Sequence, residues 1–565
     1  MRLIRKYAFL LLILSLALIL RFWHLDLAPP SANWDEASIG YNVYSVAQTG
    51  KDEFGNKLPL VFRSLNDYKP PLYIYTDAIF VKFLGLSTFT VRLPAAIFGV
   101  LSVLFTYLLI RKLTQREDVA LLSSLFLAIS PWSLQFSRSA VESGFALFFI
   151  IASAYFFLKG FEKGWFAVLS GIFFGLSLFA YQSPRIFVPL LIIILILANI
   201  KSLLKNKKTL LLFLITFAVF FLPLIHFLTI PENQARFKGV SIYENPDPFD
   251  NVANLPRRYL QKVTDDDGSV VSKVIHNRRL AIFLVLTRGY LEHFKISYLF
   301  LPGSGNNIYD TPEVGQELLV TLPLFLIGIY FLIRYKPPGY QLIILWFLAA
   351  PIVAAPTIQI PSPVRAQNMQ PMLEVIIAFG AIYLLTLLGK TKYKNIFTYA
   401  FCAIMALNFF YYLHMYYVHM PLEKSKDWQY GWQDTMSYIQ KYPDKKVIIY
   451  PELQTVLDKS QAFVLFYDKY DPESYLREGG TKLCQYGMPA RYSFGRYEMR
   501  TVDCGEGLPK LNYTENIPSD ALIVAKPDAY GQFYGLKPVK TAYHLDGTPA
   551  IEVYDSNSVK SYLKQ

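Results

Sequence analysis

The stretch from Thr90 to Arg111, TVRLPAAIFGVLSVLFTYLLIR, carries no charge between Leu93 and Ile110. An α-helix needs about 20 mainly apolar residues to cross the hydrocarbon core of a bilayer, so this stretch predicts a membrane-spanning helix. Comparable apolar runs recur along the first three quarters of the chain, beginning with Tyr7 to Trp23. The chain is therefore predicted to be a polytopic α-helical membrane protein.

The apolar runs divide into about eleven predicted spans. The composition agrees, because 53% of the 565 residues are hydrophobic and only 17% are charged, against roughly a quarter in soluble domains. The first run follows a basic start, but no small-residue cleavage pattern comes after it, so we expect a retained span rather than a signal peptide. The spans are expected near 7–25, 90–111, 118–131, 141–158, 165–181, 185–200, 209–229, 316–334, 341–357, 371–389 and 395–417.

The basic residues predict the orientation of these spans. The net charge is +13, and an excess of lysine and arginine is typical of cytoplasmic loops, so the charge does not imply a nucleic-acid partner. The turns expected on the other side of the membrane hold only one arginine each, Arg138, Arg185 and Arg365. We therefore expect a multi-pass cell-membrane protein with a cytoplasmic N-terminus. The turns expected in the cytoplasm carry Arg111, Lys112 and Arg116; Lys159 and Lys163; Lys201, Lys205, Lys207 and Lys208; Arg334 and Lys336; and Lys390, Lys392 and Lys394.

This orientation leaves two long loops on the outer face, about 26–89 and about 230–315. In the first loop, Ala37 to Ala47 and Leu72 to Leu86 mix apolar with scattered polar residues, a pattern that suits amphipathic helices lying on the membrane surface. The chemistry of the protein should be sought in these outer loops.

From about Glu423 the sequence changes to a soluble α/β pattern. We predict two domains, a transmembrane domain at 1–421 and an extracytoplasmic soluble α/β domain at 422–565. Cys484 and Cys504 lie in the exported domain, where a disulfide and two free thiols both stay open. The predicted elements are a helix at Gly431–Lys441, strands at Lys446–Tyr450 and Ala521–Ala525, and a hairpin at Lys540–Tyr554 that turns at Asp546-Gly547.

Two acids, Asp35 and Glu36, follow the first predicted span closely. Either they begin a helix, where a carboxylate complements the helix dipole, or they do chemistry at the outer interface. Further along the same loop, Lys69 stands directly before Pro70 and Pro71, which are suited to starting a helix. Lys69 would then point at a phosphate, unless it is an interfacial lysine that extends its ammonium group to water.

Three further candidates flank later spans on the same face. Arg138 and Glu142 are four residues apart and share one helix face, so a structural ion pair is the alternative to a catalytic role. Arg365 is a lone cation that could instead anchor to lipid phosphate. Two acids and three cations from distant segments on one face are the pattern expected of a catalytic site.

These residues carry a resemblance to a known family. Asp35-Glu36, Tyr68-Lys69-Pro70-Pro71-Leu72-Tyr73, Val91-Arg92-Leu93-Pro94 and Arg365 with Pro371 are similar to the pattern of membrane glycosyltransferases of the GT-C fold. The protein O-mannosyltransferases and the aminoarabinose transferases of lipid A are the nearest members. The resemblance covers the order and spacing of motifs over roughly 1–390.

The resemblance implies roles for single residues. Asp35 falls on the catalytic carboxylate of that family, Lys69 on the lysine that contacts the lipid phosphate and Glu142 on a second outer-loop acid. The aminoarabinose enzymes have a cation where this chain has Ser38 and an acid where it has Tyr68, so the resemblance does not extend to a lipid A substrate or to a metal at that acid.

The resemblance further implies a hexosyl- or pentosyltransferase that uses a sugar linked to polyprenyl phosphate. Its expected partners are that donor, membrane lipids and an acceptor hydroxyl on a protein, lipid or glycan. Asp35 would act as the general base, with Glu36 and Glu142 as further catalytic candidates, and the anomeric carbon would be inverted. Lys69, Arg138 and Arg365 would stabilise the departing phosphate. No histidine spacing fits a metal site, although a divalent cation bound together with the donor phosphate stays open. The alternative function is a polytopic transporter or lipid flippase.

Overall fold

The computed structural model describes residues 2–64, 67–229, 239–242, 262, 264–266, 268–302, 308–450, 460–481, 492–500, 517–527 and 535–563. Contacts divide the chain into two compact units. We call Met1–Trp23 with Ala95–Met415 the helical unit, and His24–Pro94 with Tyr416–Gln565 the sheet unit. The first outer loop thus groups by its contacts with the C-terminal part of the chain. The predicted division into domains 1–421 and 422–565 stays a prediction, and Cys484 and Cys504 lie outside the described residues.

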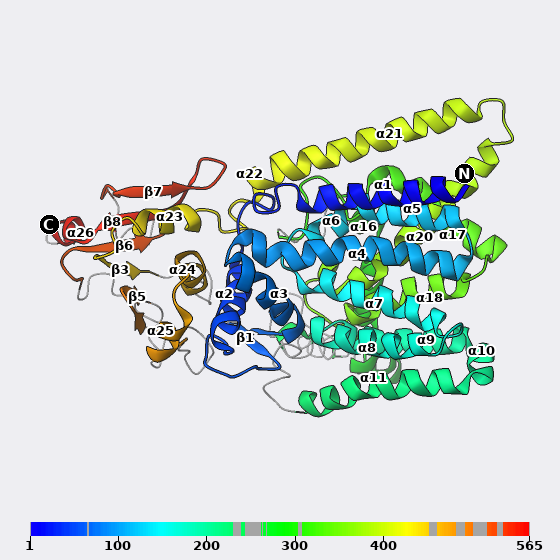
Figure 1. Cartoon of the computed structure of the whole chain (residues 1–565), viewed down its shortest axis with the longest axis horizontal. Helices are drawn as coiled ribbons and strands as arrows, with labels where there is room; N and C mark the ends of the chain where they lie inside the picture. Colours follow the sequence, from blue (N-terminus) through cyan, green and yellow to red (C-terminus); the bar gives the residue numbers. More distant parts are fainter. Residues whose placement is uncertain are drawn as a thin grey trace. The chain divides into compact units, whose positions relative to one another are not determined.

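Each of the predicted spans coincides with a helix or with consecutive helices, and Figure 1 shows these helices running along one another. Among the described residues, five helices are long and apolar enough to cross a membrane, and the bent pair α5 and α6 makes a sixth if it is one span. The remaining predicted spans appear as shorter apolar helices. The predicted fold class is confirmed. The helices at the spans are α1 (Arg2–Phe22), α4 (Thr88–Thr114), α5 (Glu117–Ile129), α6 (Pro131–Ser137), α7 (Glu142–Lys159), α8 (Trp165–Ala180), α9 (Pro184–Ala198), α11 (Lys207–Leu228), α17 (Leu322–Tyr335), α18 (Tyr340–Ala349), α20 (Gln370–Leu388) and α21 (Lys394–His414).

Short helices connect or extend the long ones. They fill the turns and part of the second outer loop. They are α10 (Ile200–Lys205), α14 (Val270–Ile275), α15 (Arg278–Glu292), α16 (Ile296–Phe300), η2 (Leu319–Thr321), η3 (Ala350–Val353), α19 (Pro363–Ala366) and η4 (Gln367–Met369).

Glycines let two of the long helices touch along their backbones. A Cβ atom added at Gly380 on α20 would lie 1.8 Å from the carbonyl oxygen of Leu324, and one at Gly328 on α17 would lie 1.9 Å from that of Ile376. Small residues at such crossings are typical of helices packed in membranes, where close backbone approach replaces the hydrophobic driving force available in water.

The sheet unit contains a six-stranded mixed sheet in the order β4-β5-β3-β6-β8-β7. β3 runs parallel to β5 and β6, and the outer pairs are antiparallel. The predicted strands at β3 and β6 and the hairpin of β7 and β8 are confirmed. At the hairpin turn, Gly547 has a φ of 82° and the Thr548 amide donates to the Asp546 side chain. The strands are β3 (Lys446–Ile449), β4 (Tyr492–Phe494), β5 (Tyr497–Met499), β6 (Ala521–Ala525), β7 (Lys540–Tyr543) and β8 (Pro549–Asp555).

Helices and a small hairpin complete the sheet unit. The predicted helix at Gly431–Lys441 is confirmed as α23. The others are α2 (Trp34–Thr49), α3 (Pro71–Leu84), η5 (Met415–His419, shared with the helical unit), α22 (Met420–Lys424), α23 (Trp432–Ile439), α24 (Ser460–Asp468), α25 (Pro472–Arg477) and α26 (Ser556–Leu563), and the hairpin strands are β1 (Phe62–Ser64) and β2 (Asp67–Lys69).

The two amphipathic helices expected in the first outer loop exist as α2 and α3. Most of α2 from Glu36 to Val46 is buried, and a Cβ atom added at Gly40 would lie 2.5 Å from the ring of Phe466 on α24. Other helices of its own unit thus cover most of α2, and its place at the membrane surface stays a prediction. By contrast, α3 exposes Phe83, at 79%, as a surface helix would.

Glu53 joins the first outer loop to the C-terminal part of the sheet unit. It is 6% exposed, and its carboxylate accepts hydrogen bonds from Asn42 Nδ2 at 2.9 Å and from Thr481 Oγ1 at 2.8 Å. Burial raises the pKa of Glu53 from 4.5 to about 7. Because this folded-state pKa lies above the unfolded value, the stability that Glu53 contributes is present at low pH and is lost as the pH rises through 7.

Glu53→Gln is expected to make the melting temperature of the protein less dependent on pH between pH 5 and pH 8. At pH 8 the variant should melt above the wild type, since burying the ionised carboxylate costs about 3 kcal/mol relative to acid pH, whereas at pH 5 the two should melt alike. The measurement is the melting temperature in detergent between pH 5 and pH 8. Glu473→Gln, at an exposed position of α25, is the matched control, and equal pH slopes in wild type and Glu53→Gln would contradict the prediction.

Candidate functional site

Asp35 and Lys69 form an ion pair in the sheet unit. Lys69 Nζ lies 2.8 Å from Asp35 Oδ1, and the side chains are 7% and 36% exposed. The lysine is thus almost buried while the carboxylate is open to solvent on one side. A carboxylate in this position can accept a proton from a hydroxyl group brought to its open side.

Local sequence accounts for the placement of both residues. Asn33 caps α2, since its side chain accepts from the Glu36 amide at 3.0 Å and its own amide donates to the Glu36 carboxylate at 3.3 Å. This capping box puts Asp35 in the first turn of the helix. Lys69 ends β2, opposite Phe62 of β1, and Pro70 and Pro71 then start α3. A helix start and a hairpin end therefore hold the two charges together.

Glu36, unlike Asp35, forms a buried ion pair with Arg92. Arg92 Nε lies 2.9 Å from Glu36 Oε1 and Nη2 lies 2.8 Å from Oε2, a two-point contact between groups that are almost fully buried. Both Glu36 oxygens are thus occupied by the guanidinium group. Of the two expectations for Glu36, the helix start fits this geometry, and the catalytic role stays without support.

Arg92 also holds the loop that precedes Asp35. Its Nη1 donates to the carbonyl oxygens of Leu25 and Pro29, each at 2.9 Å, and its Nη2 donates to that of Ser31 at 2.6 Å. The guanidinium lies 5.5 Å from the ring centre of Trp428. Every nitrogen atom of the guanidinium group therefore has a partner, and these contacts fix the chain that leads into α2. We call this set of contacts the clamp around Arg92. The sequence contained Arg92 in a motif, yet nothing in the motif indicated this role.

In the helical unit, Arg138 contacts the end of α1. It is 1% exposed, with Nη1 2.6 Å from the Leu20 carbonyl oxygen and Nη2 2.7 Å from that of Trp23. A cation at the carbonyl end of a helix complements the helix dipole. The described contacts of Arg138 thus have a structural purpose.

Glu142 and Arg365 lie on segments that are packed together. Glu142 begins α7 and is 8% exposed. Beside it, Ser143 donates to Gln367 at 2.7 Å, two residues after Arg365. Arg365 Nη1 in turn donates to the Ile358 carbonyl oxygen at 3.0 Å and to Thr357 Oγ1 at 3.2 Å.

The predicted site residues therefore fall into two groups. Asp35, Glu36 and Lys69 belong to the sheet unit, whereas Arg138, Glu142 and Arg365 belong to the helical unit. That the two groups form one site stays a prediction. Over the ranges of the chain that the structure describes, no cluster of three or more histidine, cysteine or acidic side chains could hold a metal ion.

A buried pair of acids escaped the sequence analysis. Glu317 is 2% exposed and accepts from Ser130 Oγ at 2.7 Å. It lies against Glu374, which is fully buried on α20. Gln370 donates to the same hydroxyl of Ser130 at 3.0 Å. Two carboxyl groups thus lie together in the interior of the helical unit. The sequence signal that could have found this pair was an acidic residue within a predicted membrane span.

Comparison with known proteins places these features in context. Residues 68–226 match the family model described as dolichyl-phosphate-mannose-protein mannosyltransferase. This segment includes Lys69 with its two prolines and Arg92. No curated protein matches the chain.

Among solved structures, ArnT from Cupriavidus metallidurans bound to undecaprenyl phosphate is similar, with a TM-score of 0.57 and 13% identity over 97% of this chain and 98% of that one. The apo state of the same protein gives a TM-score of 0.56 and 13% identity over 98% and 99%. The oligosaccharyltransferase of Archaeoglobus fulgidus gives 0.49 and 14% identity over 82% and 63%.

The resemblance stated from the motifs is confirmed at two levels. A mannosyltransferase family model matches the part of the chain that carries Lys69-Pro70-Pro71, and the fold is that of ArnT over nearly the whole length. The family model covers residues 68–226, and the structural match shows the fold.

Proposed function

We propose that the chain is an integral-membrane glycosyltransferase that moves a sugar from a polyprenyl-phosphate donor to an acceptor hydroxyl on the outer face of the membrane. The observation that carries the proposal is the ion pair of Asp35 and Lys69, which joins a solvent-accessible carboxylate to the lysine of the matched family segment. The undecaprenyl phosphate bound to ArnT, a protein of the same fold, supports a lipid-phosphate donor.

In the proposed reaction, Asp35 takes the proton of the acceptor hydroxyl. The hydroxyl oxygen attacks the anomeric carbon, so a new glycosidic bond forms while the bond from that carbon to the phosphate oxygen breaks, with inversion. The electron pair leaves with the polyprenyl phosphate, whose charge increases. An ammonium group has three donors, so Lys69 can hold Asp35 and still donate to a phosphate oxygen. Arg138 and Arg365 stay predicted ligands of that phosphate, and Glu142 stays a predicted catalytic acid.

Glu36 receives a different role in this proposal. With both oxygens bound to Arg92, it orients the start of α2 and thereby Asp35, and does not itself react. Asp35 is then the one proposed base in the sheet unit.

The proposal also includes an orientation. The distribution of basic residues supports a cytoplasmic N-terminus, which puts Asp35, Lys69 and the C-terminal sheet on the outer face. In a variant without the native cysteines, labelling of Asp444→Cys by a membrane-impermeant reagent in intact cells would support it, and labelling only after lysis would refute it.

The direct test is transfer of a radiolabelled sugar from a panel of polyprenyl-phosphate donors by the purified protein in lipid. Formation of labelled product together with release of polyprenyl phosphate is the expected result. Transport or lipid flipping is the second candidate, favoured by the buried acids Glu317 and Glu374 in the helical unit. Movement of the lipid across a vesicle without any transfer would replace the proposal by this candidate.

Lys69→Gln is expected to weaken use of the donor. Loss of a charge-assisted hydrogen bond, about 1.5–3 kcal/mol, should raise the KM for the donor roughly 10- to 100-fold, more than it lowers kcat. Steady-state kinetics with varied donor measure the two constants. Lys82→Gln, an exposed lysine at the end of α3, is the control, and an unchanged KM in Lys69→Gln would remove Lys69 from the donor site.

A further inference from the structure

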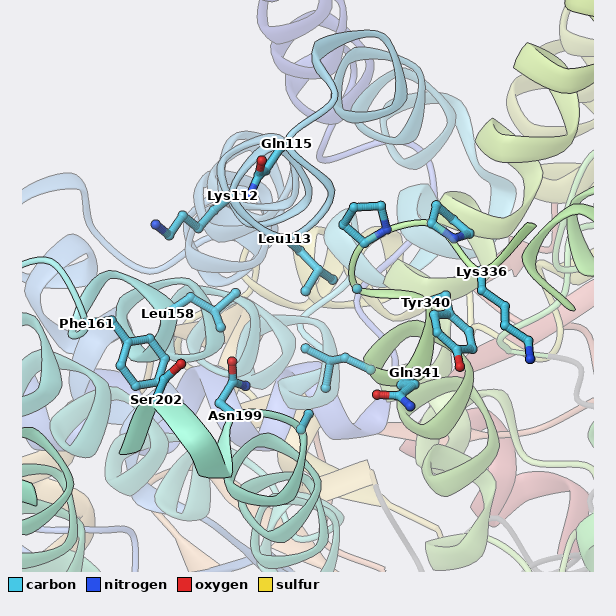
Figure 2. A pocket seen from close by; sticks show the side chains of 15 residues that line it. Lys112, Leu113, Gln115, Leu158, Phe161, Asn199, Ser202, Lys336, Tyr340 and Gln341 are labelled. Carbon is cyan, nitrogen blue, oxygen red and sulfur yellow. The ribbon is translucent and has the colours of Figure 1, made fainter. Parts of the chain in front are cut away.

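The helical unit contains a cavity whose lining includes none of the predicted site residues. It is a cavity of about 510 Å³ bordered by the ends of α4 and α7, by α9 and α10, and by the turn between α17 and α18. Figure 2 shows Lys112 and Lys336 on opposite sides of this cavity, with their ammonium groups extending outward, and Asn199 and Gln341 along its lower edge. The turns that form it are those that the basic residues predict to be cytoplasmic.

One wall of the cavity is built to a fixed shape. Lys336 has a φ of 47° and Gly339 a φ of 80°, and two prolines stand between them. A Cβ atom added at Gly339 would lie 2.4 Å from Cγ of Leu113. The turn therefore rests directly on α4, and two prolines limit its other conformations, so the recess is formed before any ligand arrives.

The lining is divided by polarity. Amide and hydroxyl groups come from Gln115, Asn199, Ser202, Tyr340 and Gln341, and hydrocarbon comes from the leucine and phenylalanine side chains that complete the lining. Leu197 and Leu204, near Asn199 and Ser202 in sequence, are 65% and 61% exposed, as lipid-facing positions of a membrane helix are. A ligand with a polar head and an apolar tail fits this division.

The lining carries positive charge, and among the described residues only part of this charge is engaged in ion pairs. Lys112 is paired with Glu162, which Lys159 also contacts at 2.6 Å. Lys336, over the described part of the chain, makes no ion pair. A neighbouring cavity, also of about 510 Å³, shares Lys112 and adds Arg111 and Lys159. Lysines in loops that serve only to set the membrane orientation of the chain do not require a cavity or amide side chains next to them.

We propose that this cavity binds the headgroup of an anionic phospholipid. Its phosphate would take the ammonium group of Lys336 and the amide donors of Asn199 and Gln341, and the first part of its acyl chain would lie along Leu113. Opposite charge, a mixed polar and apolar lining and a border of lipid-facing side chains favour this occupant over a soluble anion. The site is separate from sugar transfer and does not depend on the proposed function.

The test is native mass spectrometry of the purified protein mixed with equal amounts of phosphatidylglycerol and phosphatidylcholine. The wild type should retain phosphatidylglycerol at least about tenfold in excess, because the Lys336 ammonium group can form a charge-assisted hydrogen bond to its phosphate. Lys336→Glu and Asn199→Leu should each reduce this retention about tenfold. The second variant leaves the net charge unchanged, so its effect reports loss of the Asn199 amide, which also donates to the Leu195 carbonyl oxygen at 2.9 Å. Melting temperatures equal to that of the wild type would verify that both variants fold.

Lys205→Glu is the matched control, because it makes the same charge change at an exposed position of α10 outside the cavity. Retention in this variant should equal that of the wild type. Equal retention of the two lipids by the wild type, or an equal loss in Lys205→Glu and Lys336→Glu, would overturn the proposal in favour of general surface charge. Displacement of phosphatidylglycerol by a stoichiometric amount of polyprenyl phosphate would overturn it in favour of a phosphate monoester.

Discussion

Asp35→Asn is expected to lower kcat for sugar transfer by about 10²–10⁴-fold, the usual contribution of a general base. An amide at this position keeps the shape of the side chain but cannot accept the proton of the acceptor hydroxyl. Because Asp35 is partly exposed, the loss should leave the amount, membrane insertion and melting temperature of the protein close to wild type. Steady-state transfer from the polyprenyl-phosphate donor measures the effect.

The control is Asp444→Asn, an exposed acid of the same unit, which should retain full activity. Asp35→Glu should recover part of the rate, since it restores a carboxylate at a shifted position. Full turnover in Asp35→Asn would refute the assignment of the base while leaving the reaction class intact. No turnover in wild type with any donor would instead refute the reaction class, so the two failures are distinguishable.

Arg92→Leu is expected to be the most destabilising single substitution among the residues discussed. It leaves the Glu36 carboxylate buried without its partner and removes the donors of three carbonyl groups. Removal of one member of a buried ion pair costs about 3–5 kcal/mol. We expect a clear fall in melting temperature and, in the protein that remains folded, a loss of kcat with little change in the donor KM, because Asp35 is no longer oriented.

Arg111→Leu is the matched comparison, since its side chain is 46% exposed and is paired with Glu117 at 3.1 Å. An exposed pair contributes about 0–1 kcal/mol, so this variant should melt near wild type. Arg92→Lys keeps the charge but not the fork that binds Glu36 at two points, and should fall between the two. An Arg92→Leu protein that melts like Arg111→Leu would show that the clamp does not hold the loop.

The membrane helices could be predicted from the sequence because their signal is local. A long uncharged run such as Leu93 to Ile110 fixes a helix whatever it contacts. The hairpin at Asp546-Gly547 is local in the same sense, since its turn residues lie next to each other. The place of α2 was not predictable, because its burial against Phe466 depends on a residue from the other end of the chain.

The candidate site was predictable only in part, for a related reason. Residue type and order identified Asp35 and Lys69, and the structure brings them into contact. The adjacent acid Glu36 looks equivalent in sequence, but a helix turns successive side chains by about 100°, so one of the two faces solvent and the other faces Arg92. Which one does so depends on the register of the capping box at Asn33, a contact between neighbouring residues that a motif does not display.

The clamp around Arg92 also has a consequence for biogenesis. Trp428 and Gln429, which lie against Arg92 and bind the Trp34 amide, leave the ribosome long after the segment they stabilise. During synthesis this loop must therefore wait, without its full set of contacts, until the last part of the chain has been made. A nascent chain that stalls within α21 would present Glu36 and Arg92 without the aromatic cover of Trp428.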